Sequence, residues 1–179
     1  MELRLVKIED INVIDKIFKH SIENMIKNNI FQWDEIYPNK EILENDIRKN
    51  QMYKIILNSN IVSVFVLNKE YDKEYLSAKW EYDGNNFVIL HRLCVNAEYQ
   101  NRGFGVKTML CIEKHLKNNG IESIRLDVFS KNPIALKLYN KLGYKRTGEA
   151  TGRKGLFYFM EKIMWRARTS PVSGKWRKP

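Results

Sequence analysis

The sequence predicts an α/β protein (α+β in the stricter sense) with a mixed central sheet of about seven strands and helices on both faces. Runs of branched and aromatic residues alternate with segments of helical spacing over most of the 179 residues. A glycine-bearing loop at 100–105 joins a strand pattern to a helix pattern, and Asn132-Pro133 marks the start of a further helix. The length fits one domain.

The first third of the chain predicts one strand and two helices. Residues 2–6 have a strand pattern, and residues 10–28 carry apolar side chains at spacings of three and four. A second helix is predicted from about residue 40 to residue 49, with Asn39 as its N-cap.

A hairpin is predicted next, from strands 53–57 and 61–67 around Asn58-Ser59-Asn60. Residues 68–86 are polar and aromatic without a regular pattern. They end in Asp-Gly-Asn-Asn, which predicts a turn before the central strand at 87–95.

The loop Gln-Asn-Arg-Gly-Phe-Gly at 100–105 lies between this strand and a helical pattern at 106–117. Glycines let backbone N–H groups approach an anion, and a helix N-terminus offers unpaired donors and partial positive charge. Arg102 and Lys107 add full charges. We therefore expect a phosphate-bearing ligand here, with an ordinary glycine turn as the alternative.

The spacing of the glycines excludes two known classes of phosphate-binding loop. A dinucleotide fingerprint needs a third glycine where Thr108 stands, and a Walker loop needs four residues where only Phe104 separates Gly103 from Gly105. The pattern that remains is Gln-x-x-Gly-x-Gly at a strand-to-helix junction.

The last third predicts a strand at 124–129 and a helix that Asn132 caps and Gly143 ends. One face of that helix carries Ala135, Leu138, Tyr139 and Leu142. Two closing strands are expected at 144–147 and 156–164, joined by a glycine-rich connection from Gly148 to Gly155.

These blocks resemble a known family. Gln-x-x-Gly-x-Gly is similar to motif A of the GCN5-related N-acetyltransferases (GNAT), and residues 132–144 resemble their motif B, with Tyr144 where phenylalanine is usual. The segment Gln-Trp-Asp-Glu-Ile-Tyr-Pro at 32–38 resembles one found in small bacterial members. The resemblance covers roughly residues 1–164 and implies the acyl-CoA N-acyltransferase fold.

The resemblance implies acetyl-CoA (coenzyme A) as cofactor. It implies that backbone groups of Leu93, Cys94 and Val95 bond the pantetheine arm and that Asn132 bonds it near the second motif helix. It implies that the pyrophosphate is held by the loop and first helical turn: Gln100, Asn101, Arg102, Gly103, Phe104, Gly105, Val106 and Lys107. Ala135 and Tyr139 complete the expected cofactor-binding set.

The implied reaction is transfer of the acetyl group to a primary amine by direct attack in a ternary complex. Tyr139 matches the family's general acid, because a phenol is protonated at neutral pH and can donate to a thiolate; a core aromatic is the alternative. Glu81, His91 or a water chain could serve as base. On simple alternation His91 shares a face with Leu93 and Val95.

The acceptor is left open by the sequence. Trp33, Tyr37 and Trp80, with Tyr82, suggest an aromatic-lined pocket that binds the substrate amine, and Asp34 and Glu35 could attract a cation. A small-molecule or peptide amine fits, including antibiotics, polyamines, amino acids and protein N-termini, and a longer acyl donor stays open. The alternative function is a non-catalytic acyl-CoA-binding or sensing module.

The formal net charge is +10, and half of it comes from the acid-free segment 165–179. We expect this basic tail to be disordered, and either native or left by cloning. Binding of nucleic acid through it is the less favoured interpretation.

The remaining composition predicts a cytoplasmic monomer or homodimer. The chain shows no apolar run of membrane-spanning length and no signal peptide pattern. Cys94 and Cys111 lie on apolar patterns and are expected to be buried thiols rather than a disulfide. With two cysteines and three histidines, no zinc site is expected.

Overall fold

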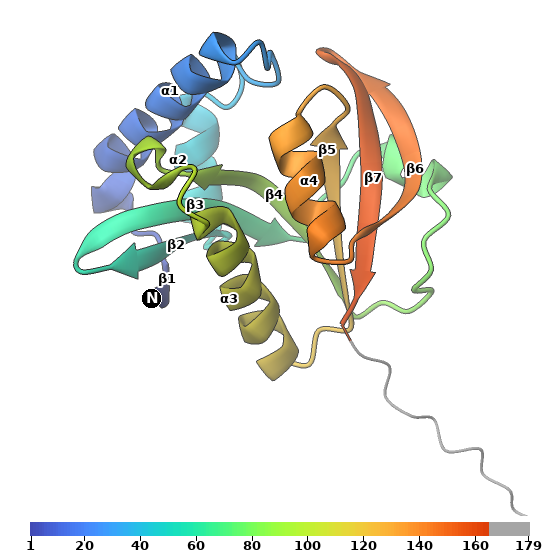
Figure 1. The fold of residues 1–179 in the computed structure, drawn as a ribbon. Coiled ribbons are helices and arrows are strands. Elements are labelled where there is room, and N and C mark those ends of the chain that lie inside the picture. Colours follow the sequence, from blue (N-terminus) through green and yellow to red (C-terminus); the bar gives the residue numbers. More distant parts are fainter. Residues whose placement is uncertain (165–179) are drawn as a thin grey trace, which may run out of the picture.

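The computed structural model describes residues 1–164, and these form a sheet of strand order β1-β2-β3-β4-β5-β7-β6 (Figure 1). The strands are β1 (Glu2–Leu5), β2 (Met52–Leu57), β3 (Asn60–Asn68), β4 (Phe87–Val95), β5 (Ser123–Phe129), β6 (Lys145–Gly152) and β7 (Gly155–Ile163). The helices are α1 (Ile11–Lys27), α2 (Lys40–Arg48), α3 (Phe104–Asn118) and α4 (Pro133–Lys141), with short 3-10 turns η1 (Ile8–Asp10), η2 (Lys73–Ser77) and η3 (Ala97–Tyr99). The predicted fold class is confirmed. The tail prediction for 165–179 lies outside the described residues.

The sheet is mixed, because β4 and β5 run parallel while every other neighbouring pair is antiparallel. The parallel pair is the one that α3 connects, as a crossover requires. The β2–β3 hairpin turns through Asn58 and Ser59, whose φ angles of 48° and 66° match the two left-handed positions of a tight hairpin turn.

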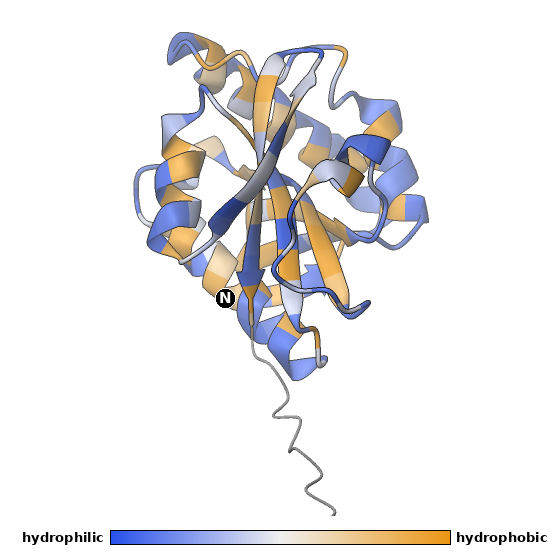
Figure 2. Cartoon of the chain, turned by 90° about the vertical axis from the view of Figure 1, so that its right-hand side faces the viewer, coloured by the Kyte–Doolittle hydropathy of each residue, from blue (hydrophilic) through white to orange (hydrophobic). Residues whose placement is uncertain are grey.

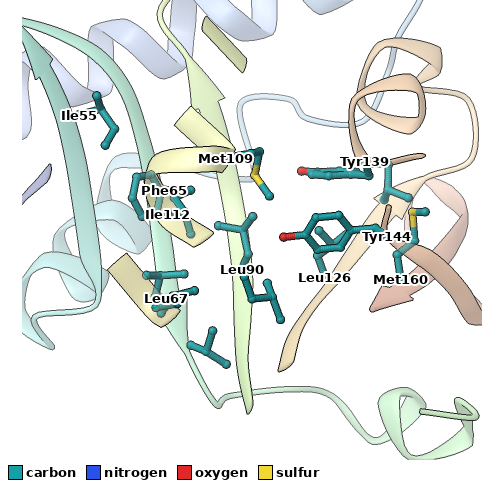
Figure 3. Close-up of a cluster of buried hydrophobic side chains, with 14 of the residues drawn as sticks. Ile55, Phe65, Leu67, Leu90, Met109, Ile112, Leu126, Tyr139, Tyr144 and Met160 are labelled. Carbon is teal, nitrogen blue, oxygen red and sulfur yellow. The ribbon is translucent and has the colours of Figure 1, made fainter. Parts of the chain in front are cut away.

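Helices α1 and α2 cover one face of the sheet, while α3 and α4 cover the other (Figure 1). Their apolar sides face the strands and their polar sides face outward, which Figure 2 shows as orange and blue. Two buried clusters result. One lies under α3 and α4 and includes Leu90, Met109, Leu126 and Tyr139 (Figure 3). The other lies under α1 and α2 and includes Ile14, Phe18 and Val64.

Two boundaries differ from the prediction by two residues or more. The expected connection from Gly148 to Gly155 is wrong, because β6 continues to Gly152 and pairs with β7 along its length. Gly148 serves close packing instead: a Cβ there would lie 3.1 Å from the Ala78 Cα. Helix α3 begins at Phe104, ahead of the predicted start at residue 106, and η2 forms in a segment predicted to be irregular.

The central strand β4 is bulged where it leaves β5. Its register with β3 shifts between Val64, opposite Cys94, and Val66, opposite His91, and Arg92 at the bulge has a φ of 50°. The pairing of β4 with β5 runs only to Leu90 opposite Leu126. Beyond that point the two parallel strands diverge, and the space between them is the start of the candidate site.

Candidate functional site

A cleft of about 1070 Å³ opens where β4 and β5 diverge. Its walls come from β4, β5, α4, the β6–β7 hairpin, the α1–α2 loop with parts of both helices, and the segment from Asn68 to Tyr75. Of the residues predicted for the site, those that line this cleft are Trp33, Tyr37, His91, Leu93, Cys94, Val95, Gln100, Asn132, Ala135 and Tyr139. The structure therefore brings together the expected pantetheine contacts, the expected acid and two of the three expected acceptor aromatics.

The bulge changes which β4 side chains share a face. Cys94 packs in the cluster under α1 and α2, where Val66, the register partner of His91, also lies. Leu93 and Val95 pack against the cluster under α3 and α4. The prediction that His91 shares a face with Leu93 and Val95 is wrong, because the extra residue at the bulge reverses the alternation.

The N-terminus of α3 is open to an anion. Among the described residues, the side chains of Asn39 and Asn132 cap α2 and α4, whereas α3 has no side-chain cap. The first-turn N–H groups of a helix lack partners within it, so those of α3 stay available. The preceding backbone turns through Asn101 and Gly103, with φ angles of 58° and 75°. This concave, exposed turn fits a phosphate group.

Basic side chains and hydrogen bonds around this turn also suit phosphate binding. Lys107 and Arg102 are exposed, and the Lys107 ammonium lies 4.7 Å from the Phe104 ring centroid. The Gln100 side chain donates to the Val95 carbonyl at 2.9 Å and accepts from Asn24 at 3.2 Å. Gln100 therefore ties the loop to the end of β4.

Helix α4 and its N-cap bring three of the predicted residues, Asn132, Ala135 and Tyr139, to the cleft. Asn132 accepts from the Ala135 N–H at 3.0 Å as N-cap, and its Nδ2 donates to Gln32 of the α1–α2 loop at 2.9 Å. Tyr139 extends from α4 toward the central strand with its ring in the core (Figure 3) and is 7% exposed. Burial, and then the charge of Asp127, raise the pKa of its hydroxyl well above the ordinary value.

Asp127, which the sequence analysis did not single out, lies on β5 in the cleft wall. Leu126 and Val128 point into the cluster under α3 and α4, so alternation sets Asp127 on the opposite face from Tyr139. The Tyr75 hydroxyl donates to Asp127 Oδ1 at 3.0 Å. Burial raises the pKa of Asp127 against the lowering effect of this bond. The available signal was one acid within an otherwise apolar strand end.

Arg92 and Asp46 form a second polar group that sequence reasoning missed. Arg92 Nη2 donates to Asp46 Oδ1 at 2.7 Å, and its Nη1 donates to the Tyr37 hydroxyl at 2.8 Å. The Asp46–Arg92 pair is buried between α2 and the bulge, with side chains 5% and 12% exposed. Tyr37 is thereby fixed at the cleft, where the sequence predicted it.

The α1–α2 loop is fastened at its acidic end. Asp34 pairs with Arg153 at 2.8 Å and with Lys154 at 2.6 Å, both on the β6–β7 turn. These partners, Arg153 first, hold the pKa of Asp34 well below its usual range. Trp33 is 8% exposed and packs on Phe18, with ring centroids 5.5 Å apart. The Asp34 carboxylate is therefore already paired with two basic side chains of the same chain.

The two candidate bases lie in unfavourable places. Glu81 is exposed at the far end of the sheet and pairs with Lys145 at 3.1 Å. His91 lines the cleft, but its Nε2 is buried without a hydrogen-bond partner among the described residues. Burial, and then Arg92, lower the pKa of His91 to about 4. Neither arrangement gives an acceptor amine a ready proton acceptor.

Trp80 also lies apart from the cleft lining. Its indole N–H donates to the Tyr75 carbonyl at 3.0 Å, and the Arg125 guanidinium lies 4.5 Å from its ring. Tyr82 bonds Glu122 through its hydroxyl. Both aromatic residues therefore brace the segment before β4 rather than line the cleft.

The remaining composition-based expectations can be compared with residues 1–164. Cys94 is buried, Cys111 is partly buried, and both thiols are free. None of the helices in this range has the length and apolar character needed to cross a membrane.

Comparisons with known proteins agree with this architecture. The model of the acetyltransferase (GNAT) family matches residues 18–144. Curated proteins give no match. A GNAT-family acetyltransferase from Streptococcus agalactiae superposes with a TM-score of 0.80 at 20% identity, covering 90% of this chain and 94% of that one.

Two further solved structures contain the cofactor. PaiA N-acetyltransferase from Thermoplasma acidophilum, in complex with coenzyme A, has a TM-score of 0.65 at 23% identity over 90% of this chain and 98% of its own. YncA from Salmonella typhimurium, with acetyl-CoA, has a TM-score of 0.65 at 16% identity over 96% and 98%. At such identities the likeness shows a shared fold.

Proposed function

The chain belongs to the acetyltransferase (GNAT) family, and from this premise we propose that it transfers the acetyl group of acetyl-CoA to a primary amine by direct attack in a ternary complex. One observation carries the proposal: the cleft between β4 and β5 adjoins an uncapped helix N-terminus and has Asp127 and Tyr139 on opposite sheet faces. The donor can thus reach the cleft from one face and the acceptor from the other.

On the donor side, the N–H groups of the α3 first turn and of residues 100–103 would hold the pyrophosphate, with Arg102 and Lys107 adding charge. The edge of β4 from His91 to Val95, which β5 leaves unpaired, offers backbone groups to the pantetheine arm. Bound acetyl-CoA supplies the thioester carbon that the amine attacks.

Tyr139 is the proposed acid. Its raised pKa keeps the hydroxyl protonated over the working range, and its place in the cleft lets it donate to the departing sulfur. The same enclosure that raises the phenol pKa disfavours a free thiolate, so proton donation there is worth more than in water.

Asp127 is the proposed base, in place of Glu81 and His91. Its carboxylate is on the acceptor side, where it can pair with an incoming ammonium group and take one proton from it. The aromatic rings of Tyr37 and Trp33 at the same side suit an aliphatic amine. The acceptor class therefore remains a small-molecule or peptide amine.

The proposal is tested with the full chain in two steps. Calorimetric titration of acetyl-CoA should show saturable binding, and a panel of polyamines, amino acids, aminoglycosides and peptides should reveal thiol release with at least one amine. No binding at millimolar acetyl-CoA would overturn the donor site. Saturable binding with no release by any amine would favour the sensing module instead.

A further inference from the structure

Tyr75 lies directly behind Asp127, on the 3-10 turn η2. Its hydroxyl donates to Asp127 Oδ1 at 3.0 Å, while its ring is buried, with 7% of the residue exposed. Tyr75 and Asp127 are 52 positions apart in the sequence, so only the fold brings them together.

The Tyr75 ring is held from several sides. The Phe159 ring centroid lies 4.6 Å away, and that of Trp80 lies 5.4 Å away. The Trp80 indole N–H also fixes the Tyr75 carbonyl. A phenol packed in this way keeps one rotamer, so its hydroxyl can hold a carboxylate in one orientation.

We propose that Tyr75 is a positioning residue: its hydroxyl orients the Asp127 carboxylate by binding Oδ1, which leaves Oδ2 to receive the acceptor amine. This inference rests on the proposed function, because it assigns Asp127 as base. It adds a residue that does not touch the reacting atoms and acts through Asp127.

Charged and titratable groups approach Asp127 from β4, from η2 and the residues before it, from the α1–α2 loop and from α4. Arg92 of β4 favours its charged form, whereas Asp72, just before η2, disfavours it. Burial first, and then the charge of Asp127, raise the pKa of Tyr37, of Tyr75 and, on the α4 side, of Tyr139. The bond from Tyr75 adds to the effect of Arg92, so removing that bond favours the protonated carboxyl.

The test is the pH profile of kcat/KM for Tyr75→Phe, with any amine that the wild-type chain acetylates. The acidic limb of this profile reports the pKa of the base in the free enzyme. It should move upward by about one pH unit, as loss of one hydrogen bond to a charged group predicts. Tyr158→Phe is the matched control. Tyr158 lies on β7 opposite Val128 and next to Phe159, and its exchange should leave the limb in place.

Two further measurements separate this inference from the proposed function. In an Asp127→Asn background, Tyr75→Phe should cause no additional shift. Carbon-13 NMR of labelled aspartate carboxyls should show the Asp127 pKa rising in Tyr75→Phe, whether or not the chain turns over. An unmoved Asp127 titration would overturn the role of Tyr75, whereas absent turnover with a moved titration would overturn only the proposed reaction.

Discussion

Tyr139 and Asp127 meet the cleft from opposite faces of the sheet, and each is held in the protonation state that its proposed role needs. Burial keeps the phenol protonated, because it raises the pKa of Tyr139. Asp127 has its pKa raised by burial and lowered by Tyr75 and Arg92, so the carboxylate becomes a better proton acceptor than a fully solvated one while it can still ionise.

At the residue scale we predict that Tyr139→Phe lowers kcat by about a hundredfold, since a positioned general acid contributes on that order. Affinity for acetyl-CoA should change little, because the ring stays in the core. Stopped thiol-release assays and calorimetry check the two parts. Tyr53→Phe serves as control, because Tyr53 is a partly buried tyrosine of β2 that stacks on Phe65 and does not line the cleft. Full turnover of Tyr139→Phe at every pH would remove the acid role.

Single residues were also where sequence reasoning reached its limit. The resemblance of residues 132–144 to the family's motif B pointed to Tyr139 and Asn132, since both belong to one local helical segment. It could not point to Asp127, Tyr75 or Arg92, because their roles arise from contacts between distant segments. A lone carboxylate in a strand carries no information on which hydroxyl the fold will set beside it.

At the scale of elements, the open N-terminus of α3 is a property of the turn before it and not of one side chain. Asn101 and Gly103 adopt left-handed conformations, so the loop presents backbone where α2 and α4 present a capping asparagine. A charged side chain in the first turn of α3 should then affect ligand binding more than one farther along the helix, because it lies nearer the proposed phosphate site.

We predict that Lys107→Glu weakens acetyl-CoA binding by about tenfold at low salt, because charge reversal near a pyrophosphate costs on the order of a kcal/mol in water. Lys114→Glu, two turns along the same face of α3 and also exposed, should have a much smaller effect. Calorimetry at low and high salt checks this, since screening should reduce the difference. Equal losses in both variants would refute a phosphate site at the helix start.

Strand β6 gives a second prediction at this scale. Gly148→Ala should lower the free energy of unfolding by about 1–3 kcal/mol, as overpacking does, because its Cβ would meet the Ala78 Cα at 3.1 Å and Phe159 at 3.3 Å. Gly152→Ala, with only ordinary contact to Phe157 at 3.5 Å, should be close to neutral. Urea unfolding of both variants measures the difference. If Gly148→Ala had the same free energy of unfolding as the wild type, residue 78 would be able to move aside for the added Cβ.

The order of strands and helices along residues 1–164 and most of their boundaries follow from local patterns, and the structure agrees with them. The β4 bulge and the full length of β6 do not, since each depends on what a neighbouring segment does. Simple alternation therefore placed His91 on the wrong face, and a run with Gly148, Gly152 and Gly155 was taken for a connection when two of these glycines lie within strand β6.

At the scale of the whole molecule, the α1–α2 loop bridges parts that the diverging strands separate. It is tied to α4 through Gln32 and Asn132, to β4 through Tyr37 and Arg92, and to the β6–β7 turn through Asp34. The three partners of the loop, Asn132, Arg92 and Arg153, all line the cleft. They make the loop a shared wall whose position depends on both halves of the sheet.

We predict that Asp34→Asn speeds amide hydrogen exchange in residues 30–38 severalfold at pH 7 and leaves β2 and β3 unchanged. Asparagine keeps the oxygen that accepts from Ile36 and Tyr37, so the substitution removes only the ion pairs with Arg153 and Lys154. Global stability should hardly change, since exposed pairs contribute little. Glu149→Gln, which removes an exposed pair with Arg146 on β6, is the control.

The same tie sets a pH dependence with a definite sign. Because the folded pKa of Asp34 is depressed, mainly by Arg153, the tie contributes fully above the unfolded aspartate value of about 3.9. It is lost only as pH falls through the lower folded value. Loop protection in the wild type, corrected for intrinsic exchange, should thus be constant from pH 7 to about 5. If protection instead fell across that range while Asp34→Asn behaved like the wild type, the loop would be held by the other two ties, and Asp34 would not bridge the two halves.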